Sequence, residues 1–376
     1  ILGGVMGYIG SLTALRRTVT LTSTTTLTKR ETKTVTQEAQ HTYYLTTLKT
    51  VKLTEYLTTT TSSSVKITKK VRNMFIGLHI HTFGENRYSD ETVRWVLPRV
   101  IFDGFDYVIV PYWIFQENKE SNTIIDEEED RIENIKWFMR KCKENGLKTA
   151  LYVFLDVLDG SWRGDINPSD VEAWFQSYIK AVNHAAAVAQ EVNADMLVIG
   201  CEMKSLERVR YLKYWKWLIG NVSSIFGGTL VYGVDWSSIA FPQEETLQFI
   251  KEFFSSDELG YVGVSAYFPL TQKSDPTLSE LEEAWTDTWI PELERIYEMT
   301  GKKILFTEIG YTSLDKTNTK PYSSEVSSVF DFKEQADCYR TFFNVFSHRD
   351  WFAGAFLFYE SIVNGIIGSW FNNDFN

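Results

Sequence analysis

Eight short apolar runs, each separated from the next by a segment of helical periodicity, are the feature of this sequence that most limits its fold. The runs span residues 75–80, 106–110, 148–155, 196–199, 229–234, 261–266, 303–306 and 354–358. Most of them lack the alternation of polar and apolar residues that marks a strand with one solvated face. Strands of this kind are buried on both faces, which is typical of a parallel sheet covered by helices.

Helical patterns fill the intervals between these runs. We expect helices over residues 90–102, 126–145, 169–192, 211–226, 244–254, 278–300 and 332–347. Ser169 can cap the third of them, and Pro291 predicts a break in the sixth. Alternating strands and helices either close into a barrel or form an open, doubly wound sheet. Because no glycine-rich phosphate loop follows a strand, we predict an α/β fold of the (β/α)8 TIM barrel type.

The first 70 residues differ in composition from the rest and divide the chain into three parts. Residues 1–17 are largely apolar, and we interpret them as a membrane anchor or signal remnant, with a buried N-terminal helix as the alternative. Residues 18–70 are rich in Thr and Ser, which make up 23 of the 47 residues from 18 to 64. This part is either a flexible stalk or an extended, β-rich segment that self-associates. Residues 71–376 form the barrel.

The formal net charge of −11 is unevenly distributed along the chain. Residues 1–70 carry ten Lys or Arg against three Glu, whereas the remainder carries 28 basic and 46 acidic residues. An acidic globular part argues against nucleic acid as a partner and suits a neutral polymer. The three cysteines, at 142, 201 and 338, show no metal-binding spacing, so we expect neither a metal nor another cofactor.

Polar and aromatic side chains follow the predicted strands, at the end where barrels of this type carry their active sites. Glu202 and Glu308 come after the fourth and seventh apolar runs, where a carboxylate is costly to bury. Two such carboxyl groups are what hydrolysis of a glycosidic bond requires. The alternative for each is a carboxylate that caps the following helix. At the same ends we expect substrate-binding side chains, namely His81, Trp113, Asp235, Trp236, Tyr267 and Tyr311.

Two of these assignments have open alternatives. Asp235 could orient a sugar hydroxyl or cap the helix that follows it. His79 and His81 point to the same side of their strand because side chains alternate with a period of two. We therefore place only His81 at the rim and expect His79 to be packed inside.

Six short motifs occur in a fixed order along the barrel. They are Trp162-Arg-Gly164, Trp174-Phe-Gln-Ser-Tyr178, Ile199-Gly-Cys-Glu-Met203, Gly263-Val-Ser-Ala-Tyr-Phe-Pro-Leu270, Leu305-Phe-Thr-Glu-Ile-Gly-Tyr311, and Gln335 ahead of Trp351-Phe-Ala-Gly354. Together they resemble glycoside hydrolase family 113, a clan A group of retaining β-mannanases on a (β/α)8 barrel, over residues 74–370.

The resemblance implies a role for several residues. Glu202 matches the acid/base and Glu308 the nucleophile. Tyr267 matches a tyrosine that hydrogen-bonds the nucleophile, and Trp162 and Arg163 match a pair at the cleft.

The chain departs from the clan pattern at two places. Cys201 stands where much of the clan has an Asn that binds the sugar 2-hydroxyl, and Phe358-Tyr359 replaces a Trp under the sugar.

We therefore expect a retaining endo-β-glycosidase that acts on a polysaccharide, first of all β-mannan. We expect it at the cell surface, on a stalk whose composition resembles that of archaeal surface proteins. The alternative is a non-catalytic glycan-binding or structural barrel head on a self-assembling surface filament.

Overall fold

The computed structural model describes residues 17–19, 67–69, 74–127, 129–363 and 366–369. All of the anchor predicted over residues 1–17 except Arg17, and most of the 18–70 stalk, therefore lie outside the described residues. Of the first 70 residues, the structure describes two short strands, β1 (Arg17–Val19) and β2 (Ile67–Lys69), which pair in an antiparallel ladder. No helix in the described part of the chain is long and apolar enough to cross a membrane.

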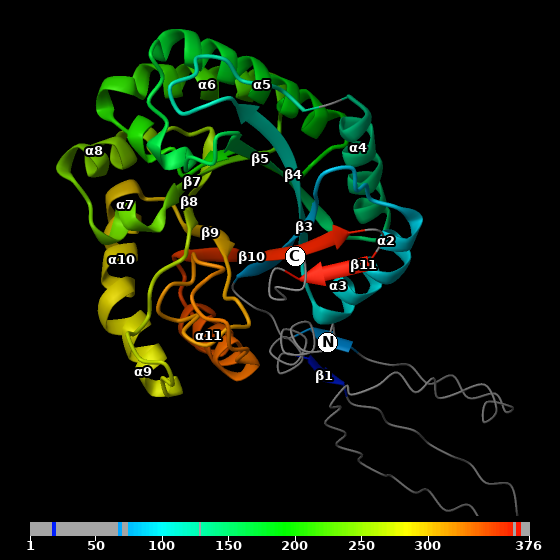
Figure 1. The fold of residues 1–376 in the computed structure, drawn as a ribbon, viewed down its shortest axis with the longest axis vertical. Helices are drawn as coiled ribbons and strands as arrows, with labels where there is room; N and C mark the ends of the chain where they lie inside the picture. Colours follow the sequence, from blue (N-terminus) through cyan, green and yellow to red (C-terminus); the bar gives the residue numbers. More distant parts are fainter. Residues whose placement is uncertain (1–16, 20–66, 70–73, 128, 364–365, 370–376) are drawn as a thin grey trace, which may run out of the picture.

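Eight parallel strands close into a barrel (Figure 1). In chain order they are β3 (Phe75–Thr82), β4 (Tyr107–Gln116), β5 (Lys148–Val157), β6 (Met196–Cys201), β7 (Thr229–Asp235), β8 (Leu259–Ser265), β9 (Ile304–Ile309) and β10 (Phe352–Val363). Each strand pairs with the next along the chain, and β10 also pairs with β3, which closes the ring. The predicted (β/α)8 barrel is confirmed.

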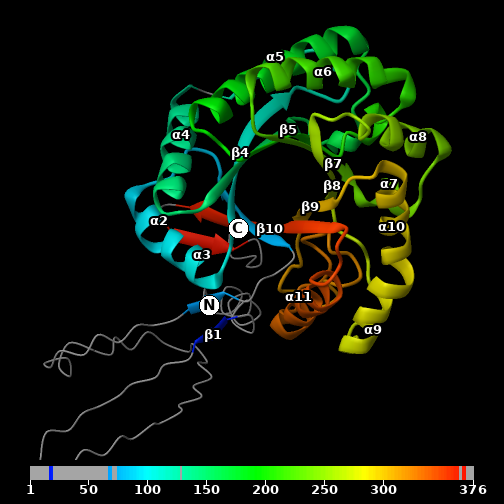
Figure 2. The same cartoon turned by 180° about the vertical axis from the view of Figure 1, so that it is seen from behind.

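Helices cover the outside of this ring (Figures 1 and 2). They are α2 (Asp90–Trp95), α3 (Leu97–Asp103), α4 (Glu129–Glu144), α5 (Val171–Glu191), α6 (Leu212–Ile225), α8 (Glu244–Phe253), α9 (Leu278–Glu283), α10 (Ile290–Thr300) and α11 (Phe332–Phe346). Apolar side chains between strands and helices form the larger core, and a smaller cluster fills the barrel interior. Both faces of the strands are thus buried, which is why their sequences are continuously apolar.

Several predicted boundaries differ from those in the structure. The helix expected over residues 90–102 is two helices, α2 and α3. Asp170 caps α5 in place of Ser169, and its side chain accepts from the Ala173 N–H at 3.0 Å. The sixth helix is divided into α9 and α10, and Pro291 lies in the first turn of α10, next to the predicted break, where no backbone N–H donor is needed. A π-helical turn (Ala284–Trp289) joins α9 to α10.

Two short elements were not predicted from the sequence. One is α7 (Trp236–Ala240), which begins directly after β7. The other is β11 (Ile366–Ser369), which pairs antiparallel with the end of β10 and lies beside α2 and α3 in both views.

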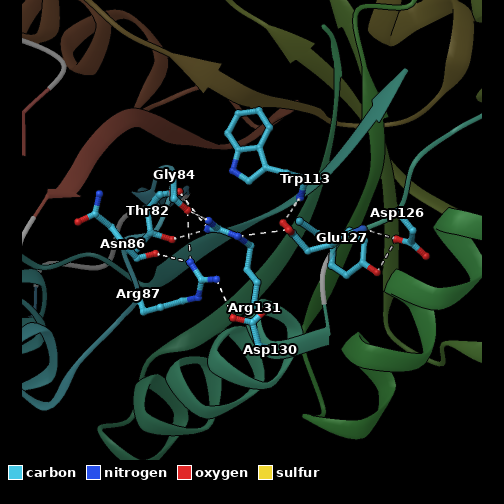
Figure 3. A network of polar contacts seen from close by, with 10 residues as sticks. Thr82, Gly84, Asn86, Arg87, Trp113, Asp126, Glu127, Asp130 and Arg131 are labelled. Atoms are coloured by element: carbon cyan, nitrogen blue, oxygen red, sulfur yellow. Dashed lines mark hydrogen bonds and ion pairs between the residues drawn. The ribbon is translucent and has the colours of Figure 1, made fainter. Parts of the chain in front are cut away.

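Polar contacts tie the C-terminal ends of β3 and β4 to α4 (Figure 3). Arg131 of α4 donates to the Thr82 hydroxyl at 3.2 Å and to the Gly84 carbonyl, and its Nε lies 3.2 Å from Glu127. Glu127 in turn accepts from the backbone N–H of Trp113 at 3.3 Å. This network fixes the stretch of backbone from which the Trp113 side chain projects.

Candidate active site

Glu308 lies near the end of β9 and is only 3% exposed. Tyr152 of β5 donates to its Oε1 and Tyr267, just after β8, donates to its Oε2, each at 2.9 Å. Burial and the charge of Glu202 raise the pKa of Glu308 to about 8, although the Arg163 guanidinium and the two phenols act in the opposite direction. Two carboxylates that repel each other favour a state in which they hold one proton between them.

Glu202 follows β6 and is 8% exposed. Its backbone has a φ of +58°, in the left-handed region that residues other than glycine seldom adopt. The Glu202 N–H donates to the Gly233 carbonyl of β7 at 2.8 Å, and its own carbonyl accepts from the Lys204 N–H at 2.8 Å. Neighbouring strand and turn thus hold a backbone conformation that costs about 1–3 kcal/mol.

Arg163, on the loop after β5, connects the two glutamates electrostatically. Its Nε donates to the Leu155 carbonyl at 2.8 Å, and its Nη1 lies 3.4 Å from Cys201 Sγ and 3.6 Å from Glu202 Oε2. The same positive charge lowers the pKa of Glu308. One cation therefore offsets part of the cost of burying two like charges at this end of the barrel.

Trp162 lies beside Glu202 with its ring partly in solvent. The ring nitrogen is 3.4 Å from Glu202 Oε2, and the side chain is 42% exposed. A Cβ added at Gly164 would lie 2.3 Å from this ring, so the glycine leaves room for it. The exposed aromatic surface is suited to stacking on a sugar ring.

Asp235 caps α7, one of the two roles left open from the sequence. Its carboxylate accepts from the Ser237 N–H at 3.0 Å and from the Ser237 hydroxyl. Burial and the charge of Glu202 raise the pKa of Asp235 to about 6. A third carboxylate therefore interacts with Glu202 from the end of β7.

Trp236 stacks on Tyr322 from the loop between β9 and α11. Their ring centroids lie 5.9 Å apart at an interplanar angle of 13°, and Tyr322 is 50% exposed. The sequence pointed to Trp236 but not to Tyr322, because nothing local marks a partner so far along the chain.

His81 does not lie at the rim as predicted: it is fully buried near the end of β3, where its ring packs beside Trp113 of β4. Their ring centroids are 5.9 Å apart, and His81 stacks on Tyr359 at 4.6 Å. His79 is packed inside the barrel, as expected, where its Nε2 donates to the Thr307 carbonyl at 2.9 Å and burial lowers its pKa to about 3. Neutral His79 then presents an acceptor nitrogen to His81 Nε2, 3.3 Å away.

Tyr311 is not part of this group. It is fully buried in the outer core, with its ring 5.2 Å from that of Tyr339 on α11. Side chains alternate along an extended chain, so Glu308 and Gly310 face the interior while Ile309 and Tyr311 face the helices. The structure therefore removes Tyr311 from the predicted substrate-binding set.

Tyr152, like Tyr322, is a site residue that the sequence did not indicate. It shares a face of β5 with Phe154 and Asp156, so its inward direction could have been read from the period of two. Its contact with Glu308 could not, because the two residues meet only when the barrel closes.

Two interacting carboxylates at the C-terminal end of a (β/α)8 barrel, with aromatic side chains around them, define the site of a glycoside hydrolase. The family model of Glycoside Hydrolase Family 113 matches residues 79–361. The chain belongs to glycoside hydrolase family 113.

Solved structures of similar proteins have the same fold. The GH113 β-mannanase AaManA from Alicyclobacillus acidocaldarius, in complex with ManMIm, is 22% identical with a TM-score of 0.62, and the match covers 77% of this chain and 86% of that one. A structure described as a GH113 β-1,4-mannanase is 23% identical with a TM-score of 0.62, covering 76% and 88%. No curated protein matches the sequence.

Proposed function

We propose that this protein is a retaining endo-β-glycosidase that cleaves β-mannan. The observation that carries the proposal is the pair of interacting carboxylates, Glu202 and Glu308, in two different environments at one end of the barrel. Membership of family 113 supports a glycosidase. The solved structures of similar proteins are those of β-mannanases, which supports mannan as the substrate.

In the first step, ionised Glu308 attacks the anomeric carbon while protonated Glu202 gives its proton to the departing glycosidic oxygen. The C–O bond to the leaving sugar breaks as the bond to Glu308 forms. We place the pair's single proton on Glu202, because both oxygens of Glu308 already accept hydrogen bonds from tyrosines.

In the second step, Glu202 acts as a base. Glu308 is now a neutral ester, so its charge no longer opposes an ionised neighbour. Glu202 takes a proton from water, the resulting hydroxide attacks the anomeric carbon, and Glu308 leaves as a carboxylate. The pair returns to one shared proton, ready for another cycle.

Substrate binding is proposed for the polar and aromatic side chains around the pair. Trp162 and Trp236 present aromatic surface beside Glu202 and Asp235, and Trp113 lies near the end of β4, packed on the buried His81. Aromatic faces stack on the apolar faces of pyranose rings. Binding sugars on both sides of the cleaved bond is what endo action requires.

We also propose that residues 18–70 display the barrel at the cell surface, either as a simple tether or as a self-associating stalk. The Thr/Ser-rich composition and the apolar residues 1–17 support this placement. Fractionation of the source cells, with a mass measurement on the full chain, tests it. Recovery of a monomer only in the cell interior would contradict surface display and self-association.

The test of function is hydrolysis of mannan, xylan and β-glucan by the full chain, with Glu202→Gln as the control. We expect release of sugar from mannan, and a loss of about 10²- to 10⁴-fold in the variant. Cleavage that is equal in the variant would contradict the acid/base assignment. No cleavage of any polymer would contradict the enzyme and favour a non-catalytic barrel.

A further inference from the structure

A buried carboxylate that the proposed reaction does not use, Glu207, follows the turn that carries Glu202. Glu207 is fully buried, and its Oε1 accepts from the Tyr232 hydroxyl at 2.9 Å while its Oε2 accepts from the Ser238 hydroxyl at 3.3 Å. Burial raises its pKa to about 8. A buried carboxyl group costs free energy, so its hydrogen bonds must serve the structure around it.

The Tyr232 hydroxyl links Glu207 to the residue directly after Glu202. Its oxygen accepts from the backbone N–H of Met203 at 3.1 Å. Since the hydroxyl proton is given to Glu207, a lone pair remains for Met203. The Tyr232 ring is enclosed edge-on by Trp215, with centroids 4.8 Å apart, so the hydroxyl has little freedom to move away.

The turn after Glu202 is therefore held by successive bonds to β7. The Glu202 N–H donates to the Gly233 carbonyl at 2.8 Å, and the Met203 N–H donates to the Tyr232 side chain. These two bonds flank the φ of +58° at Glu202. Because such a conformation persists only where the surroundings fix it, losing one of these bonds releases the turn.

We propose that Tyr232 and Glu207 are positioning residues that hold the backbone of Glu202 so that its carboxyl group meets the departing glycosidic oxygen. The proposal rests on the acid/base role of Glu202 given above. Neither residue touches substrate: both act through the Met203 N–H. The pair fixes the direction of one catalytic group and leaves Glu308, which has its own tyrosines, unaffected.

The test compares Tyr232→Phe with wild type on two substrates that differ only in the leaving group. A β-mannooligosaccharide needs a proton from Glu202 on its departing sugar, whereas the same glycone linked to dinitrophenol releases its leaving group without one. We expect kcat/KM on the oligosaccharide to fall about 10- to 100-fold, because misplacing a catalytic group has effects of this size. On the dinitrophenyl substrate we expect kcat/KM to stay within about 3-fold of wild type, because this leaving group needs no acid.

Three further variants separate positioning from general damage to the fold. Glu207→Gln keeps an acceptor for the Tyr232 hydroxyl, so the ratio of its kcat/KM values on the two substrates should equal that of wild type. Glu207→Leu removes the acceptor, so its ratio should equal that of Tyr232→Phe. Tyr88→Phe is the matched control, because Tyr88 is a buried tyrosine that donates to the Ile80 carbonyl at 2.7 Å away from this turn. This variant should change kcat/KM by the same factor on both substrates.

The outcomes distinguish the inference from the function on which it rests. If wild type is active and Tyr232→Phe loses kcat/KM equally on both substrates, or loses none on either, the positioning role alone is overturned. A wild type inactive on both substrates would overturn the proposed function and the inference with it. If a thermal melt shows that Tyr232→Phe is unfolded, Ser238→Ala takes its place, because it removes only one hydrogen bond to Glu207. The positioning role then requires a larger loss of kcat/KM on the oligosaccharide than on the dinitrophenyl substrate.

Discussion

Glu308 and Glu202 interact across one end of the barrel, yet they are held in opposite ways. Glu308 sits on a strand, and both of its oxygens accept hydrogen bonds of 2.9 Å from tyrosines on other strands or strand ends. Glu202 sits on a turn in a left-handed conformation, and the contacts of its carboxylate with Trp162 and Arg163 are 3.4 and 3.6 Å long.

The difference matches what each carboxylate is proposed to do. A nucleophile must keep one position and one charge state, and short bonds from two phenols stabilise an ionised carboxylate. An acid that becomes a base must gain and lose a proton and meet first a sugar oxygen and then a water molecule. Longer contacts and a supported backbone leave the Glu202 side chain free to change partners while its origin stays fixed.

Removing the proposed nucleophile tests the difference between the two glutamates most strongly. Glu308→Ala should lower kcat by about 10⁴-fold or more, because the variant lacks the carboxylate on which the covalent intermediate forms. Azide added to this variant should occupy the vacated space and give a glycosyl azide of inverted configuration. A Glu308→Ala protein that releases sugar at the wild-type rate would end the assignment.

Removing one phenol tests whether the tyrosines hold an anion. Tyr267→Phe should lower kcat/KM by about 10- to 100-fold, the worth of one hydrogen bond to a charged group. Tyr311→Phe is the matched control, because Tyr311 belongs to the outer core and its loss should change kcat/KM by less than about 3-fold. Equal losses in both variants would mean that Tyr267 acts only through stability.

The pH dependence of kcat/KM tests the shared proton. Burial and Glu202 raise the pKa of Glu308 to about 8, with Arg163, Tyr152 and Tyr267 acting against them. Above that pH the pair loses its last proton, so kcat/KM should fall about tenfold per pH unit on the alkaline side. The phenols lower this pKa, so Tyr267→Phe should move the limb to higher pH. A limb that moves to lower pH would contradict the hydrogen-bond assignment.

The smallest effect concerns stability and the buried carboxyl group of Glu207. Its pKa is about 8 in the folded chain against 4.5 for an ordinary Glu, so the folded state holds a proton that the unfolded state releases. The resulting stability is present below pH 4.5 and is lost as the pH rises through 8.

Glu207→Gln removes this titration and keeps the acceptor. The Tm of this variant relative to wild type should therefore rise with pH, by about 2–4 °C for each ~1 kcal/mol of difference in the free energy of unfolding. Thermal melts at pH 5 and pH 9 provide the measurement. A difference in Tm that is the same at both values would contradict a raised pKa.

The sequence was sufficient for the barrel and for its two glutamates, for a physical reason. Parallel strands buried on both faces leave long apolar runs, and a carboxylate at the end of such a run is conspicuous. The same reasoning failed at Tyr311, where the alternation of side chains places the residue toward the helices although it follows the same strand as Glu308.

Contacts between distant strands account for what the sequence did not show. Tyr152 reaches Glu308, and Tyr322 reaches Trp236, only after the ring closes. The role of Asp235 as a helix cap depended on α7, which is too short to produce a periodic pattern. The proposed support of Glu202 by Tyr232 likewise depends on the left-handed backbone of Glu202, which no local sequence pattern predicts.

Trapping the glycosyl-enzyme tests the division of labour between the two glutamates most directly. A 2-deoxy-2-fluoro-mannosyl fluoride should inactivate the protein by slowing hydrolysis of the ester, and mass spectrometry of the digested protein should locate the label. We predict a single label on the peptide that contains Glu308. A label on Glu202, or unlabelled protein that still turns over mannan, would contradict the account.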